Sequence, residues 1–69
     1  MNDFINRLID EKQQLDEKIE KLTTFIHSEN FKTIEYVQQS LLQIQLLSME
    51  TYSQCLTERL VWLSPQSAA

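Results

Sequence analysis

Charged residues placed inside otherwise apolar helical stretches are the feature of this sequence that could support binding chemistry. Glu11 and Lys12 interrupt the stretch FINRLIDEKQQLDEKIEKLTTFI, and Arg59 lies beside a second apolar stretch. A guanidinium held away from water requires a carboxylate, a carbonyl or a phosphate as partner. The ring of Tyr52 is able to stack on a base, although aromatic residues at helical spacing more often belong to a core. These residues indicate a bound anion or a polar contact between subunits.

Simpler interpretations stay open for the same residues. Glu11 and Lys12 would reach water if the facing helix curved away from them. Arg59 would be satisfied by an ion pair with Glu11 or Glu58. The sequence does not decide between these interpretations and ligand binding.

Catalysis and metal binding have little support in this sequence. His27 is the single histidine, and Cys55 has no histidine near it in sequence that would activate its thiol. Asp16, Glu17 and Glu20 alternate with lysines, as expected of a solvated helix face. We therefore expect a protein that is not an enzyme and has no cofactor and no metal site.

Composition restricts the fold and the partners further. The 69 residues contain no glycine and a single proline, which disfavours tight hairpin turns and phosphate-cradling loops. Six basic residues stand against ten acidic ones, giving a net charge of −4, so binding in DNA or RNA grooves is not expected. The sequence shows no signal peptide and no membrane-spanning stretch, and we expect a soluble, cytoplasmic protein.

Apolar periodicity predicts an all-α fold, an antiparallel hairpin of two long helices. The spacing predicts one helix over about 3–27 and another over about 34–63, joined by a short link in which Thr33 caps the second helix. Residues 64–69 are expected to form a disordered tail after this 1–63 hairpin. The predicted first stripe is Phe4, Leu8, Leu15, Ile19, Leu22 and Ile26. The predicted second stripe is Ile34, Val37, Leu41, Leu42, Ile44, Met49, Tyr52, Leu56, Leu60 and Leu63.

The second predicted helix carries more apolar surface than one seam can cover. The apolar residues that fall outside its stripe are Leu46, Leu47, Val61 and Trp62. Left uncovered, such a surface drives association. These four residues are therefore the predicted oligomer interface, and we expect a homo-oligomer, at least a dimer forming a four-helix bundle.

The sequence also resembles a known group of proteins. The spacing Phe4-x-x-Arg7-Leu8, Glu11, Leu15, Lys21-Leu22, Phe25, then Gln38-x-x-Leu41-Leu42-x-x-Gln45-x-x-x-Met49-x-x-Tyr52-x-x-x-Leu56-x-x-Arg59 is similar to that of very short phage helical-hairpin proteins. These are in turn similar to the hairpin domain of phage anti-CBASS and anti-Thoeris sponges. Those sponges are oligomers that bind cyclic nucleotide immune signals between subunits without turning them over.

The resemblance implies that this chain is a phage anti-defence protein acting in the host cytoplasm by sequestering a cyclic oligonucleotide. The ligand-binding residues that it suggests are Arg7, Glu11, Lys12, Gln45, Tyr52 and Arg59. In such a pocket, arginines from different subunits would pair with phosphates while tyrosine stacks on a base. The alternative is a small phage or prophage regulator that binds a host defence protein through its exposed apolar helix face.

Overall fold

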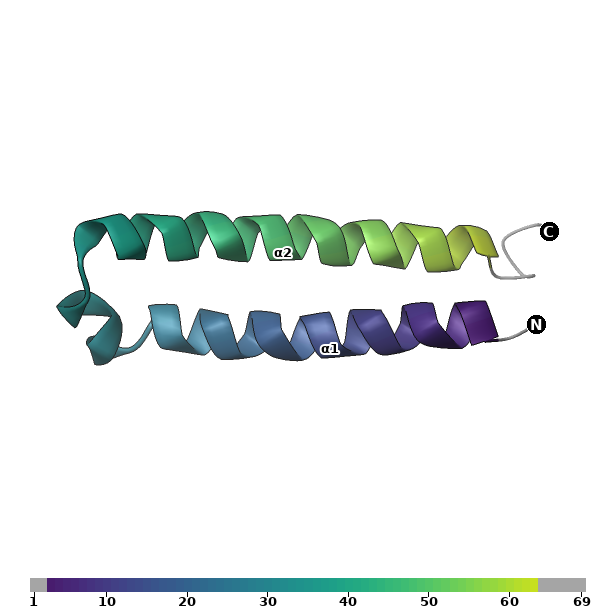
Figure 1. Cartoon of the computed structure of the whole chain (residues 1–69), viewed down its shortest axis with the longest axis horizontal. Helices are drawn as coiled ribbons and strands as arrows, with labels where there is room; N and C mark the ends of the chain where they lie inside the picture. Colours follow the sequence, from purple (N-terminus) through teal and green to yellow (C-terminus); the bar gives the residue numbers. More distant parts are fainter. Residues whose placement is uncertain (1–2, 64–69) are drawn as a thin grey trace.

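The computed structural model describes residues 3–63 and shows two long helices lying side by side (Figure 1). Helix α1 spans Asp3–Ile26, the 3₁₀ helix η1 spans Glu29–Thr33, and helix α2 spans Tyr36–Leu63. The described part of the chain contains no β-strand. Its extents of 50 × 17 × 15 Å are those of a thin rod one hairpin wide. The predicted all-α helical hairpin is confirmed, whereas its assembly into a bundle remains a prediction.

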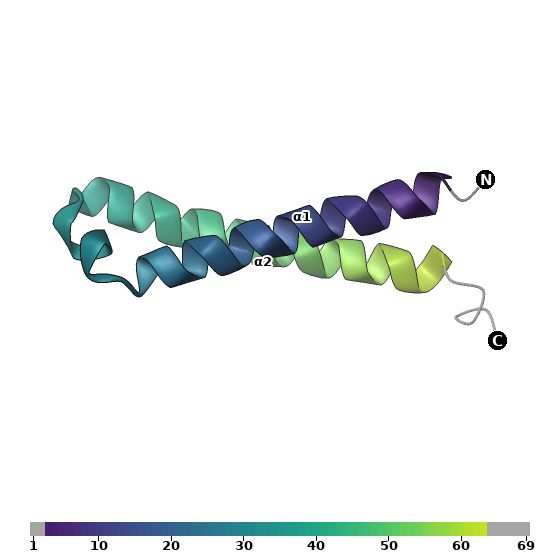
Figure 2. The same ribbon diagram turned by 90° about the horizontal axis from the view of Figure 1, so that it is seen from below.

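The two helices cross at a shallow angle and meet along one seam (Figure 2). Seam residues recur at alternating steps of three and four, the heptad spacing of a coiled coil, and each is buried or half-buried. From α1 they are Ile5, Leu8, Lys12, Leu15, Ile19, Leu22 and Ile26. From α2 they are Gln39, Leu42, Leu46, Met49, Ser53, Leu56 and Leu60. Leu8 and Leu56 are the most buried seam residues, with exposed fractions of 4% and 0%.

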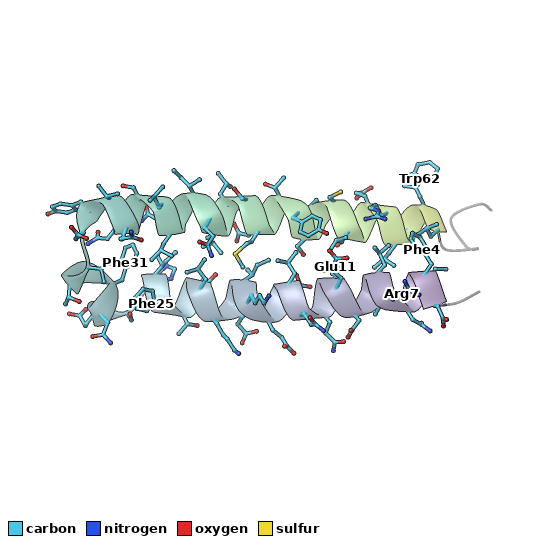
Figure 3. The ribbon with its side chains drawn as sticks, viewed as in Figure 1. Phe4, Arg7, Glu11, Phe25, Phe31 and Trp62 are labelled. Atoms are coloured by element: carbon cyan, nitrogen blue, oxygen red, sulfur yellow. The ribbon has the colours of Figure 1, made fainter. Side chains whose placement is uncertain are left out.

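The link between the helices is a closed turn rather than an open loop. Phe31 in η1 is buried and packs edge-on against Phe25, with ring centroids 6.0 Å apart (Figure 3). The Thr33 hydroxyl donates to the Asn30 carbonyl at 2.7 Å, so the prediction that Thr33 caps the second helix is wrong. The backbone N–H of Gln39 donates to the Glu35 carbonyl at 2.9 Å, and the second helix begins at Tyr36, slightly later than predicted. Nε2 of Gln39 also donates to the Ile34 carbonyl at 2.9 Å.

The predicted second stripe combined residues from two opposite faces of α2. Val37, Leu41 and Ile44 were predicted to face the first helix but are 52–67% exposed. Leu46 was predicted to lie outside the stripe, but it is half-buried at a seam position. The cause is that α2 is apolar on both sides, so its periodicity does not identify the inward face. The prediction of a disordered tail over residues 64–69 falls outside the described residues.

The far side of α2 carries a second set of apolar residues. At heptad positions roughly opposite the seam lie Val37, Leu41, Ile44, Leu47, Val61 and Trp62, which together we name the outer face. Figure 3 shows the Trp62 side chain pointing away from α1. The corresponding side of α1 is polar, with exposed Asp3, Asp10 and Glu17. Within residues 3–63, α2 is therefore the one helix that presents an uncovered apolar face.

Candidate anion-binding side of the hairpin

A polar cluster in the middle of the seam accounts for part of the charged interruption in α1. Lys12 donates to Oδ2 of Asp16 at 2.6 Å and to Oγ of Ser53 at 3.4 Å. Ser53 in turn donates to Oδ1 of Asp16 at 2.5 Å. These three residues connect α1 to α2 by a closed set of hydrogen bonds. Lys12 is thus engaged within its own hairpin instead of reaching another subunit.

The same cluster changes the acidity of Asp16. Hydrogen bonds from Lys12 and from Ser53 stabilise the carboxylate and lower the pKa of Asp16 below 3.8. The prediction that Asp16 belongs to a simple solvated face is therefore wrong, because its carboxylate is tied to the opposite helix. The sequence shows part of this signal, since Asp16 lies one turn after Lys12, whereas the seam position of Ser53 is visible only in the structure.

We expect this cluster to make the hairpin sensitive to acid. A carboxylate whose pKa is lower in the folded chain stabilises the fold above its unfolded pKa, and that contribution is lost as the pH falls through the folded value. Asp16→Asn should lower the melting temperature at pH 5–7, and the difference from wild type should shrink as the pH is lowered toward 2. Thermal melts followed by circular dichroism between these limits measure the effect.

Glu17→Gln removes a charge from an exposed position of α1 and serves as the control. A melting-temperature difference for Asp16→Asn that stays constant from pH 7 to pH 2 would contradict the role assigned to its carboxylate.

The other charged residue of the interruption, Glu11, contacts α2 on the opposite side of the seam. The Tyr52 hydroxyl donates to Oε2 of Glu11, and Figure 3 shows Glu11 directed toward α2. This hydrogen bond to the carboxylate favours the protonated phenol and raises the pKa of Tyr52 above its ordinary value. Tyr52 keeps 43% of its surface exposed. Its ring is therefore positioned by Glu11 while still accessible to a ligand.

Heptad register places most of the predicted ligand-binding residues on the side of the hairpin that carries this contact. Gln45, Tyr52 and Arg59 recur at intervals of seven along α2, which sets them in one row. Arg7 lies one helical turn before Glu11 on α1, and so shares its side. We name this surface the Tyr52 side, defined by Arg7, Glu11, Gln45, Tyr52 and Arg59. Lys12 does not belong to it, because its ammonium group is directed to Asp16 on the other side.

Basic residues collect on the Tyr52 side although the chain as a whole is acidic. Of the six basic residues of the chain, four fall there by register: Arg7, Lys18, Lys21 and Arg59. Glu11 is the acidic residue among them by register, and Asp3 and Asp10 line the depression that contains Arg7. Asp16, Glu20 and Glu50 fall on the opposite side of the hairpin. Basic residues therefore outnumber acidic ones on the Tyr52 side, which favours an anion there.

Sequence reasoning missed Lys18 and Lys21, which it assigned to a solvated face. The signal that could have found them is their spacing, because Lys18 follows Glu11 by seven residues and Lys21 follows Arg7 by fourteen. Within residues 3–63, Arg59 forms no ion pair, so neither predicted carboxylate partner binds it. Glu58 instead accepts from Gln54 at 3.1 Å. The Arg59 guanidinium is exposed and open to a ligand.

The other surface features of the described helices and link do not form an enclosed site. An open depression along the start of α1 is lined by Asp3, Asn6, Arg7 and Asp10, and its two carboxylates make it a poor anion site. In the described residues, no three side chains of the metal-binding types come together. None of the helices in that part of the chain has the length and apolarity needed to cross a membrane.

Comparison with known proteins identifies relatives of this chain. Residues 2–61 match the profile of the family described as Sequestin. A relative in Enterobacteria phage T4 is described as an uncharacterized 7.5 kDa protein in the denB–rIIB intergenic region. It is 41% identical over 54 residues, which cover 78% of this chain and 84% of the relative. No solved structure matches the chain. The predicted resemblance to short phage helical-hairpin proteins is confirmed.

Proposed function

This chain belongs to the Sequestin family, and we propose that it is a phage anti-defence protein that captures a cyclic nucleotide immune signal on its Tyr52 side. The family name points to a sequestering protein. A nucleotide is supported as the ligand by one observation: basic side chains share one side of an acidic hairpin with an exposed tyrosine. Phosphates need cationic partners and a purine needs a flat surface to stack on.

The residues of the Tyr52 side divide these tasks between them. The Arg59 guanidinium pairs with a phosphate, for which its forked geometry is suited. Arg7 is the weaker phosphate partner, because Asp3 and Asp10 line the same depression. Tyr52, oriented by Glu11, stacks on a base, and the exposed Gln45 amide donates or accepts a hydrogen bond at a base edge. No step in this binding breaks a covalent bond. The protein acts in the host cytoplasm by lowering the free concentration of the signal.

Binding to a panel of cyclic nucleotides tests this proposal. Purine cyclic dinucleotides and cyclic tri-adenylate are titrated into the chain by calorimetry, and the bound molecule is recovered intact by mass spectrometry after denaturation. Arg59→Ala should weaken binding about 10- to 100-fold, the size of a lost charge-assisted hydrogen bond. Lys32→Ala, which removes the same charge from the link at an exposed ion pair with Glu29, is the matched control.

The control variant should bind as tightly as wild type. Two outcomes would contradict the proposal: no member of the panel binds, or Arg59→Ala and Lys32→Ala lose affinity equally. Recovery of a hydrolysed nucleotide would contradict capture without catalysis.

A further inference from the structure

We infer that the outer face of α2 is covered by the α2 helix of a second copy of this chain, paired antiparallel about a two-fold axis near Met49 and Glu50. This pairing rests on the proposed function only in what it adds to the ligand site. The arrangement itself follows from the exposure, spacing and charge of α2.

The apolar area of the outer face is roughly half of what one partner buries in a standard interface. Its six apolar residues are each about half exposed or more, with Trp62 at 78% and Val37 at 67%. Taking about 100 Å² for a whole aliphatic and about 200 Å² for a whole tryptophan side chain, their exposed fractions leave on the order of 450 Å² open to water. Each partner in a standard protein–protein interface contributes about 800 Å². The exposed Ser48, Thr51 and Cys55 between them add further contact area, so one copy of the same helix covers this face in a small interface.

The spacing of the outer face suits a helical partner. Positions 37, 41, 44, 48, 51, 55, 58 and 62 alternate steps of four and three, which is a second heptad seam on the same helix. Among these positions only Glu58 is charged, and its carboxylate is held by Gln54 along its own helix. A seam with so little charge is characteristic of a face that packs rather than one that is solvated.

The length of α2 makes this seam complementary to itself. Helix α2 spans Tyr36–Leu63. When two copies overlap completely in antiparallel orientation, each residue of one copy lies opposite the residue of the other copy for which the two residue numbers add up to 99. In that register, seam positions face seam positions. Ile44 faces Cys55, Ser48 faces Thr51, and Trp62 faces Val37. In the fourth pair, Leu41 faces Glu58, which is the one charge on this seam. A two-fold axis that maps the seam onto itself is the isologous contact typical of homodimers.

The pairing also sets the two Tyr52 sides next to each other. Because the outer face lies roughly opposite the seam, the four helices form a flat layer in the order α1–α2–α2–α1 instead of a square bundle. A two-fold axis perpendicular to this layer brings both Tyr52 sides onto the same broad face. Tyr52 of one copy then lies near Gln45 of the other, whereas the two Arg59 residues stand 19 positions apart, about 28 Å along the axis. A nucleotide at this site would therefore meet Tyr52 and Gln45 from different copies but a single Arg59.

Disulfide trapping tests the pairing without any nucleotide. Ile44→Cys in the native background places a thiol opposite Cys55 of the second copy, and oxidation should convert most of the chain to a covalent dimer. The control is the double variant Ile44→Cys with Cys55→Ser, which should not cross-link. Its thiols at position 44 in the two copies lie eleven positions apart, about 16 Å along the axis. Wild type should not cross-link for the same reason, since a disulfide requires Cα atoms within about 7 Å.

Three outcomes would overturn the inference. Cross-linking of wild type through Cys55 would indicate parallel helices, and equal cross-linking of Ile44→Cys and its control would indicate another register. A chain that stays single and uncross-linked would leave the outer face to a different protein, such as a host target. Nucleotide binding without the Ile44–Cys55 cross-link would overturn the pairing alone, whereas cross-linking without nucleotide binding would overturn the proposed ligand alone.

Discussion

Leu56→Ala is expected to lower the free energy of unfolding by about 2–5 kcal/mol, the range measured for leucine deletions in well-packed cores. Leu56 is the one residue of the described chain with no exposed surface, and it lies at a seam position of α2 against α1. A domain of this size has a total stability of only several kcal/mol. The substitution should therefore bring much of the protein close to unfolding at room temperature.

Urea unfolding followed by circular dichroism, at a fixed chain concentration, measures this loss. Leu63→Ala makes the same chemical change at the end of α2, where the residue is 40% exposed, and should cost less than about 1 kcal/mol. Equal losses for the two variants would contradict the seam described here.

Ile44→Glu is expected to dissociate the dimer. The substitution removes an apolar side chain from the middle of the outer face and places a carboxylate where the second copy packs. An unpaired buried charge costs several kcal/mol, and by symmetry the cost is incurred twice in each dimer. The dissociation constant should therefore rise by at least about a thousandfold. Sedimentation equilibrium at several concentrations measures it.

Gln13→Glu adds the same charge on the exposed, polar surface of α1 and is the matched control. It should leave the dimer intact. An unchanged dissociation constant for Ile44→Glu would mean that the outer face is not where the copies meet.

How far the sequence predicted the fold depended on which helix was considered. For α1, the predicted stripe positions Leu8, Leu15, Ile19 and Leu22 lie at the seam of the structure. Phe4, also predicted for that stripe, is 53% exposed, and Ile5 takes the seam position instead. For α2, apolar residues occupy both the seam and the outer face, and a period of 3.6 fits either. The surplus of apolar surface was thus predictable, but the assignment of Leu46 to the seam required the structure.

The candidate site was predictable in its residues but not in its geometry. Tyr52 and Arg59 are seven residues apart, so their shared side of α2 can be seen in the sequence. The contact between Tyr52 and Glu11 depends instead on how the link sets the two helices in register. The link itself was only partly predicted, because the packing of Phe31 on Phe25 is a tertiary contact that local turn preferences do not encode. The two charges of the interruption proved to point to opposite sides of the seam.

The mass of the wild-type chain in solution tests the central claim most directly, namely that α2 uses one face within the hairpin and the other between two copies. Light scattering coupled to size exclusion, at tens of micromolar chain and without added nucleotide, should give twice the chain mass of 8.2 kDa. A monodisperse species of 8.2 kDa would contradict the claim, because the outer face would then remain exposed to water in a stable single chain.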